Sequence, residues 1–210
     1  PNIEKYQSLE ITKTLDLGTL PRLPRANSLT IDGVETQYRP NGVEITVYDF
    51  LPVIENLQLT NIPFNNSILD FRNCNRLEVL DLTGCTGINS IILPEGKTKE
   101  VKLPACIKSL AIINNPNINY LELQEGTKLN NLTLNCSSSG NINVSELIET
   151  YFDFNNAILL KLQGGCNLDL HIVERMSILG SKCDLQGTYT ILDEGAEADI
   201  SYQLKKALVK

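Results

Sequence analysis

The chain contains 210 residues, carries a formal net charge of −7 and has a sequence pI of about 4.8. This acidic balance argues against a protein that tracks nucleic-acid phosphates or binds anionic membranes, because either function needs clustered Lys and Arg. Hydrophobic residues make up 42% of the chain, which is enough to bury a continuous core, and no apolar run approaches the roughly 18 residues of a transmembrane helix.

The N-terminal residues 1–53 are expected to form strands and a hairpin that cap the following repeat. Within them, VETQYRPNGVEITVYDF at 34–50 alternates apolar and polar residues on both sides of the turn sequence RPNG at 39–42. Upstream, the prolines of PRLPR at 21–25 predict a stiff connector. Its two arginines are better explained as exposed linker residues than as a contact site.

Residues 54–136 contain the main repeat of the chain. Apolar residues recur in pairs of the form Leu-x-Leu at steps of roughly 9 to 12 residues, and such alternation places both members of a pair on one side of a strand. Every pair therefore predicts a short strand with inward-facing apolar side chains. Taking every second pair gives two columns, Leu57/Leu59, Leu80/Leu82, Val101/Leu103 and Leu121/Leu123 in the first and Leu69/Phe71, Ile91/Leu93, Leu110/Ile112 and Leu132/Leu134 in the second.

Each coil of about 20 residues thus contains two strands, whereas an ordinary leucine-rich unit of that length has one. The pattern predicts a flattened solenoid whose walls are two parallel sheets, with coils about 4.8 Å apart and one thin core between the walls. Turn sequences rich in Pro, Gly and Asn mark the corners, for example LPEG at 93–96 and NNPN at 114–117.

Asparagines are concentrated at the corners of the predicted coils. Asn73, Asn114, Asn115 and Asn135 fall just past predicted strands. At such positions a side-chain amide can bond backbone groups of the turn above or below. For any single one, an Asn that only tolerates turn geometry is an equal alternative.

Two segments of the repeat resemble the leucine-rich repeat consensus: LEVLDLTGC at 77–85, with Cys85 at the Asn/Cys position, and LNNLTLNC at 129–136, with Cys136 one place early. The segment LPACIKSLAI at 103–112 is similar to the short repeats of bacterial surface proteins. The resemblance implies a β-rich, leucine-rich-repeat-like flattened solenoid with an N-terminal hairpin and a few short capping helices. The uneven steps and the second strand per coil depart from the family, so no ligand site is carried over.

Residues 137–210 are expected to continue the solenoid with helical insertions and a C-terminal cap. In NVSELIETYF, Asn143 and Glu146 have the spacing of a capping box at the start of a short helix. The pair Leu160/Leu162 then predicts a strand that rejoins the stack.

Two further helices and a strand are predicted near the C terminus. LDLHIVERMSILG predicts a helix over about 170–179, with Asp169 at its start and Gly180 past its end. CDLQGTYTIL predicts one strand, and ISYQLKKALV predicts a helix capped by Asp199. Leucine-rich coils followed by the helix and strand of ERMSILGSKCDLQGTYTI resemble leucine-rich repeat regions of tail-associated and other virion proteins of phages of gut bacteria. This second resemblance implies a structural protein of a virion.

Residue types that carry catalysis or bind metals are sparse. His171, the single histidine, is expected to be a polar surface or cap residue rather than a catalytic base. The six cysteines contain no Cys-x-x-Cys motif. Cys74, Cys85, Cys106 and Cys136 follow strands of the repeat, so we expect buried free thiols there, although an even number of cysteines also permits disulfides. The acidic residues Asp193, Glu194, Glu197 and Asp199 could supply the carboxylate pair of a glycosidase, but a solvated turn explains them better. We therefore expect no enzyme, metal site or cofactor.

The outward-facing residues of the second column include Ile68, Ile92, Ala111 and Ile113. We expect them to stack into one exposed apolar stripe, and such stripes commonly mark an interface. The expected partner is another subunit or a neighbouring domain, with cover by the predicted helices of this chain as an equally weighted alternative.

The outward-facing residues of the first column are mainly polar and include Asp81, Lys102, Tyr120 and Glu122. An aromatic ring among hydrogen-bonding groups suits the face of a sugar. These four residues therefore form a candidate ligand face for a glycan.

Taken with both resemblances, these patterns favour a non-enzymatic structural or interaction module of a larger assembly, located in a phage virion or its tail. The alternative is a secreted bacterial surface adhesin or a carbohydrate-binding leucine-rich repeat protein. The expected partners are protein subunits, with a surface glycan as the second candidate. Neither nucleic-acid binding nor membrane insertion is expected.

Overall fold

The computed structural model describes residues 6–11, 22–33, 50–65, 68–135, 142–193 and 196–197. Apart from Phe50, the hairpin predicted at 34–50 lies outside these residues. The helix predicted after Asp199 lies outside them as well.

Six parallel strands form the first wall of the molecule, in the order β1-β2-β3-β5-β7-β9. They are β1 (Ser8–Ile11), β2 (Ser28–Asp32), β3 (Asn56–Thr60), β5 (Val79–Asp81), β7 (Glu100–Leu103) and β9 (Tyr120–Leu123). Every neighbouring pair is parallel. Because β1 and β2 precede residue 54, this wall extends farther toward the N terminus than the Leu-x-Leu repeat.

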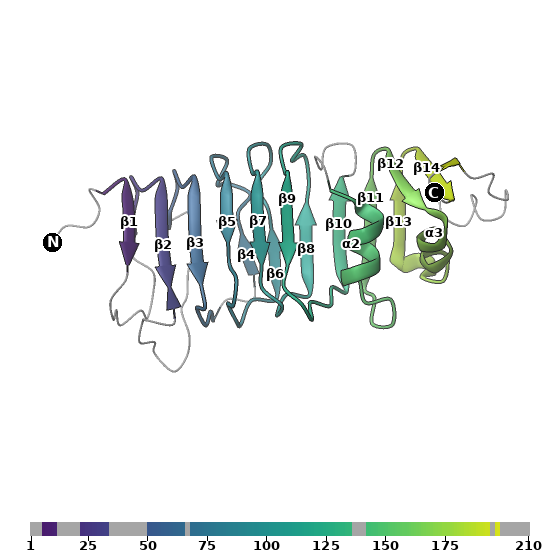
Figure 1. The fold of residues 1–210 in the computed structure, drawn as a ribbon, viewed down its shortest axis with the longest axis horizontal. Coiled ribbons are helices and arrows are strands. Elements are labelled where there is room, and N and C mark those ends of the chain that lie inside the picture. The colour runs from purple at the N-terminus through teal and green to yellow at the C-terminus, as the bar shows by residue number, and fades with distance from the viewer. Residues whose placement is uncertain are drawn as a thin grey trace.

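Six further parallel strands form the second wall, in the order β13-β11-β10-β8-β6-β4. They are β4 (Ile68–Asp70), β6 (Ser90–Ile92), β8 (Ser109–Ile112), β10 (Asn131–Asn135), β11 (Leu159–Gln163) and β13 (Cys183–Gln186). Figure 1 shows the strands following one another along the long axis of the molecule. The predicted β-rich flattened solenoid with two parallel sheets is confirmed, and β11 is the predicted returning strand.

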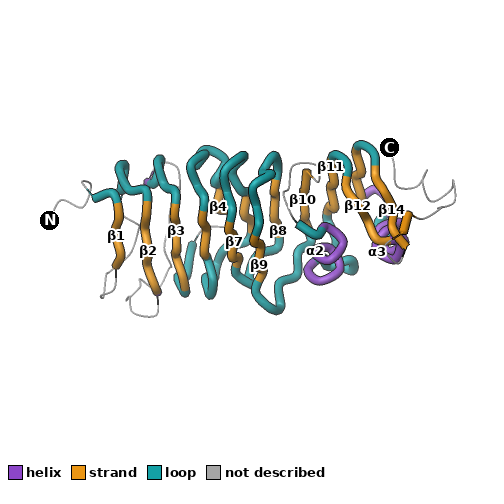
Figure 2. Tube along the Cα trace, turned by 45° about the horizontal axis from the view of Figure 1, so that its top comes forward, coloured by secondary structure: helices purple, strands orange, loops and turns teal. Residues whose placement is uncertain are grey.

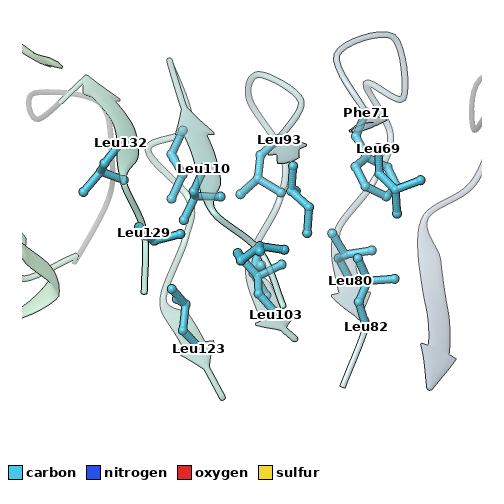
Figure 3. Packing of buried hydrophobic residues seen from close by; sticks show 14 of the residues in the cluster. Leu69, Phe71, Leu80, Leu82, Leu93, Leu103, Leu110, Leu123, Leu129 and Leu132 are labelled. Atoms are coloured by element: carbon cyan, nitrogen blue, oxygen red, sulfur yellow. The ribbon is translucent and has the colours of Figure 1, made fainter. Parts of the chain in front are cut away.

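The hydrophobic core lies between the two walls. Of the sixteen residues in the two predicted columns, all except Leu121 are buried, and Leu121 is partly buried. The strand register places members of one column side by side, as in Leu80 beside Val101 and Leu110 beside Leu132. Figure 3 shows side chains of both columns meeting in the interior. The period-two alternation of the sequence therefore identified the inward faces correctly.

Polar side chains at the corners join one coil to the next. The amide of Asn115, which is buried, donates from Nδ2 to the backbone oxygen of Pro94 one coil away, at 3.1 Å. Nδ2 of Asn135 donates to Oδ1 of Asn114 at 3.1 Å. The predicted role of corner asparagines in bonding an adjacent turn is confirmed for Asn115, and Asn135 bonds the side chain of Asn114 one coil away.

The close approach of coils also explains a glycine at a corner. Gly87 has a φ of +76°, which favours glycine, and a Cβ atom there would lie 1.9 Å from the backbone oxygen of Phe64. Phe64 N donates to Thr86 O at 2.8 Å, so the two turns are held together at that separation. A side chain at this position would force the coils apart.

Helix α2 (Val144–Tyr151) begins where the sequence predicts a helix. The side-chain oxygen of its N-cap, Asn143, accepts a hydrogen bond from Glu146 N at 3.2 Å. Its buried residues include Leu147 and Ile148, which face the core. The predicted N-cap is confirmed.

Helix α3 (Leu170–Ser177) follows Asp169 as predicted and leads into the short 3-10 helix η4 (Gly180–Lys182). The side chain of Asp169 makes no capping hydrogen bond. Its backbone N–H donates instead to Oγ of the buried Ser145 at 2.9 Å. This bond ties the start of α3 to helix α2.

A third, small sheet contains β12 (Cys166–Asp169), β14 (Tyr189–Asp193) and β15 (Ala196–Glu197). The single strand predicted over 183–192 is wrong, because the structure divides this segment between β13 in the second wall and β14 in the third sheet. Gly187, with a φ of +110°, lies between the two strands and allows the chain to turn there.

The first wall stops at β9 although the second wall continues through β10, β11 and β13. Helix α2 is the next element beyond β9 on the first-wall side, and it packs against β12 (Figures 1 and 2). A helix therefore stands where another first-wall strand would otherwise lie. Among the described residues, no strand pairs with the side of β9 that faces away from β7.

Candidate binding surfaces

The register of the first wall brings the four predicted ligand residues together. Lys102 pairs with Asp81 on one side and with Glu122 on the other, so the three side chains form a row across β5, β7 and β9. Tyr120 lies two residues before Glu122 on the same face of β9 and is 46% exposed. The prediction from alternation therefore placed these residues on one outward surface.

Hydrogen bonding and charge orient the ring of Tyr120. Its hydroxyl donates to Oε2 of Glu122 at 2.5 Å, and Nζ of Lys102 lies 6.0 Å from the ring centroid. The hydrogen bond to the Glu122 carboxylate raises the pKa of the Tyr120 phenol. The phenol therefore stays a neutral donor, and the cluster offers an aromatic ring, a cation and carboxylates to a ligand.

A groove of about 340 Å³ opens between β9 and α2, next to this cluster. It is lined by Ile118, Asn119, Tyr120, Leu121, Ile142, Asn143, Glu146, Leu147, Thr150 and Tyr151. Its end near Leu123 is marked by the hydroxyl of Tyr151, which donates to Leu123 O at 3.1 Å. Of the predicted interface and ligand-face residues, Tyr120 is the one that lines the groove.

The groove was not predicted from the sequence, because it forms where the strand pattern of the first wall is interrupted. The first column of apolar pairs has its last member at 121–123, whereas the second column continues with the pair at 160–162. The capping sequence at 143–146 lies in that gap. Both signals are visible in the sequence, but they do not by themselves place the helix in the first wall beside β9.

The four residues of the predicted apolar stripe lie on three neighbouring strands of the second wall, with Ile113 just after β8. Ile92 pairs directly with Ala111, whereas Ile68 pairs with Ser90. Ile68 is 55% exposed, and the other three side chains are partly buried. They form a short aliphatic patch, which we call the second-wall patch.

Ile92 and Ala111 form the central row of the second-wall patch, and a polar residue flanks this row on each side. Asp70 pairs with Ile92 on one side, and Thr133 pairs with Ala111 on the other. Helix α2 packs against β12, and α3 packs against β12 and β14, on the first-wall side of the core (Figure 1). The helices that were considered as cover for the patch therefore complete the other wall.

The described cysteines of the repeat, Cys74, Cys85 and Cys106, form no disulfide, as predicted, and Cys74 and Cys85 are buried whereas Cys106 is partly buried. Cys136 lies outside the described residues. Sγ of Cys85 donates to Leu59 O at 2.8 Å, one coil away. Burial raises the pKa of Cys74 to about 11 and that of Cys85 to about 12, so neither buried thiol forms a thiolate nucleophile near neutral pH.

The remaining candidate catalytic residues are His171 and the acidic residues Asp193, Glu194, Glu197 and Asp199. His171 is exposed, and its Nε2 lies 3.3 Å from Oε2 of Glu149 on α2. Asp193 pairs with Ala196 in the antiparallel pair β14–β15, whereas Glu194 and Asp199 lie outside the described residues. Within the described ranges, His, Cys, Asp and Glu form no group of three that could hold a metal ion. No helix in that part of the chain is long and apolar enough to cross a membrane.

Comparison of the chain with models of protein families gave no match, and comparisons with curated proteins and with solved structures gave none either.

Proposed function

We propose that this chain is a non-enzymatic structural and interaction module of a larger assembly, namely a virion or tail-associated protein of a phage of gut bacteria. The observation that supports this most is the continuous core between two parallel walls. Parallel ladders that run from one coil to the next make an elongated element that resists bending, because the central coils are hydrogen bonded to their neighbours on both walls and the terminal coils on one wall. Such an element suits a spacer or a docking surface.

The proposed contact with the assembly is the second-wall patch. Ile68, Ile92, Ala111 and Ile113 place aliphatic groups on a sheet face, where a flat partner surface can remove them from water. The polar neighbours Asp70 and Thr133 would form the rim of such an interface. An enzyme is not proposed, because burial keeps the thiols of Cys74 and Cys85 protonated near neutral pH and the exposed His171 lies beside the Glu149 carboxylate at 3.3 Å.

Fractionation of phage particles and cells tests whether the chain is located in a virion or on a bacterial surface. Particles are purified on a density gradient, and peptides of this chain are quantified by mass spectrometry in the particle, secreted and cell-surface fractions. The proposal expects the chain in particles at a constant ratio to other structural proteins. Recovery only from the secreted or cell-surface fraction would sink the virion assignment and favour the adhesin.

Variants then test the second-wall patch within that experiment. Ala111→Asp introduces a charge into the patch and should remove the chain from particles, while circular dichroism shows that it stays folded. Gln163→Asp is the matched control, because Gln163 lies on the outer face of β11 in the same wall, outside the patch and its rim. Normal incorporation of Ala111→Asp would refute the patch as the interface.

A carbohydrate-binding protein is the second candidate, favoured by the exposed ring of Tyr120 beside Lys102 and Glu122. Screening the chain against immobilised glycans tests it, with Tyr120→Ala expected to abolish any binding. Tyr6→Ala is a suitable control, since Tyr6 is similarly exposed, at 48%, and lies at the far end of the first wall. Binding that persists in Tyr120→Ala would exclude this face.

A further inference from the structure

Strand β9 has one edge that no described strand covers. The hydrogen bonds between β9 and its neighbour β7 show which backbone N–H and C=O groups of β9 point toward this open edge. In the preceding pair, Lys99 O accepts from Asn119 N at 2.9 Å and from Tyr120 N at 3.1 Å, and Leu103 O accepts from Gln124 N at 3.0 Å. Residues of a parallel strand bond alternately to either side. Tyr120 and Glu122 therefore bond to β7, and the backbone of Leu121 points away from it.

In earlier coils, the backbone oxygen just before each first-wall strand accepts hydrogen bonds from N–H groups of the next coil. Glu78 O accepts from Lys99 N at 2.8 Å and from Glu100 N at 3.2 Å, as Lys99 O does for the next coil. Asn119 O is the equivalent acceptor of β9. Among the described residues no backbone N–H donates to it, because the next element is a helix whose own N–H groups bond within the helix.

The groove lies directly against this edge. Ile118 and Leu121 line it from the strand side, and Leu147 and Thr150 line it from α2. Four residues of β9 and its approach, 118–121, border the groove, and four residues of extended chain span about 13 Å. The space therefore has the length of a short strand, with hydrogen-bonding groups along one side and apolar side chains around them.

The charge at the rim favours one kind of side chain. Glu146 lines the groove, is exposed, and occurs in none of the ion pairs among the described residues. Glu122 lies on the neighbouring face of β9, and its carboxylate accepts the hydroxyl of Tyr120. The Glu146 carboxylate forms no ion pair with a described Lys or Arg, so it can bind a cationic group of a ligand.

We propose that the groove between β9 and α2 binds an extended peptide segment of a partner, which adds as a strand to the open edge of β9 and places a Lys or Arg beside Glu146. Recognition of this kind takes affinity from main-chain hydrogen bonds and specificity from alternate side chains. The peptide lies in the groove between β9 and α2 and pairs with the open edge of β9. It thereby covers a strand edge of the kind that proteins usually protect from association. The proposal rests on the proposed interaction function and assigns it a second contact, distinct from the second-wall patch.

The test uses the whole chain and a display library of random hexapeptides. Peptides are selected for binding to the wild-type chain and counter-selected against Leu121→Pro. Proline removes the Leu121 N–H from the open edge without removing a hydrogen bond to β7, and edge strands tolerate proline. Enriched peptides should alternate apolar and polar residues and contain Lys or Arg. The absence of enriched peptides, or enrichment of peptides that bind Leu121→Pro equally well, would overturn the proposal.

Two further measurements use the selected peptide and do not depend on the proline variant. Glu146→Gln should weaken binding about fivefold, whereas Glu149→Gln, on the same helix but outside the groove, should not. Methylating alternate backbone nitrogens of the peptide should weaken binding at least about tenfold in one of the two alternations, since those N–H groups donate to β9. Equal binding by both methylated peptides would refute strand addition.

The remaining outcomes separate this proposal from its rivals. A soluble oligosaccharide that binds through Glu146 while no peptide is enriched would assign the groove to a glycan and overturn the proposal. If the chain is present in particles but the selection fails, the groove proposal alone is wrong. If the selection succeeds and the chain is absent from particles, the virion assignment alone is wrong.

Discussion

Two buried side chains at coil corners, Cys85 and Asn115, hold neighbouring coils together at the scale of single residues. Each bonds a backbone oxygen of the preceding coil, Leu59 O for Cys85 and Pro94 O for Asn115. In both cases a polar atom that would be costly to bury alone is paired. The corners are therefore bonded by side chains in addition to the strand ladders.

The pKa of Cys85 predicts how stability depends on pH. Burial raises this pKa from 9.0 to about 12. In the unfolded chain the thiol loses its proton near pH 9.0, whereas the folded protein keeps it. The free energy of unfolding should therefore fall as the pH rises from 9.0 toward about 12. Urea unfolding at a series of pH values checks this, and Cys85→Ala should show a smaller decline. An identical slope in both proteins would contradict the prediction.

Asn115 predicts a local loss of stability. Removing its amide in Asn115→Ala leaves Pro94 O buried without its donor, and this should cost about 1 to 3 kcal/mol in the free energy of unfolding. Asn117 is a matched control, because it also donates to the preceding coil, at Gly96 O, but it is exposed. Chemical denaturation of Asn115→Ala and Asn117→Ala should therefore give clearly different losses, and equal losses would show that burial of the bond is unimportant.

At the scale of elements, a helix can occupy the position of a strand in one wall. Each wall is built from strands of three to five residues with one or two inward side chains, so a single strand contributes little alone and depends on its neighbours. Helix α2 can replace a first-wall strand because its face with Leu147 and Ile148 supplies the apolar groups that the core needs. The replacement keeps the core closed but leaves the edge of β9 open.

Core substitutions test the inward register of the strands in both walls. Leu82→Ala and Ile112→Ala should each reduce the free energy of unfolding by about 2 to 5 kcal/mol, because each leaves a cavity in a thin core with little room to collapse. Lys102→Ala, on the outer face of β7, should change it by less than about 0.5 kcal/mol. Denaturant titration measures all three, and a loss below about 0.5 kcal/mol at either core position would contradict the assigned register.

At the scale of the whole molecule, the coils contact mainly their neighbours. Both sheets connect each strand only to the adjacent coils, so destabilisation should spread over a limited distance. This property distinguishes a stack of coils from a domain with a central core.

Hydrogen exchange tests this limited spread of destabilisation. Leu160→Ala, at a fully buried position of β11, should increase amide exchange in β10, β11 and β13 more than in β3. Leu57→Ala in β3 provides the reciprocal control at the other end of the stack. Mass spectrometry of exchanged peptides resolves these regions. A uniform increase throughout the chain would indicate that the molecule opens as one cooperative unit.

The sequence by itself determined the two walls and the inward residues. Alternation of pairs such as Leu57/Leu59 specifies which side of a strand is buried, because side chains of a strand point to opposite faces in turn. It also placed Asp81, Lys102 and Glu122 on one outer row, since each lies at the outward position between or beside the inward residues of its strand. These features depend on local geometry that is repeated along the chain.

Only the tertiary structure decided where the repetition stops. The placement of β1 and β2 in the first wall, the division of 183–192 at Gly187 and the groove beside Leu121 all depend on which distant segment takes each edge. A helix signal at Asn143 predicts a helix, but it does not say that the helix replaces a strand of one wall while the other wall continues. That choice depends on the fit of the apolar face of α2 against the core and β12, and such long-range packing is not encoded in any local period.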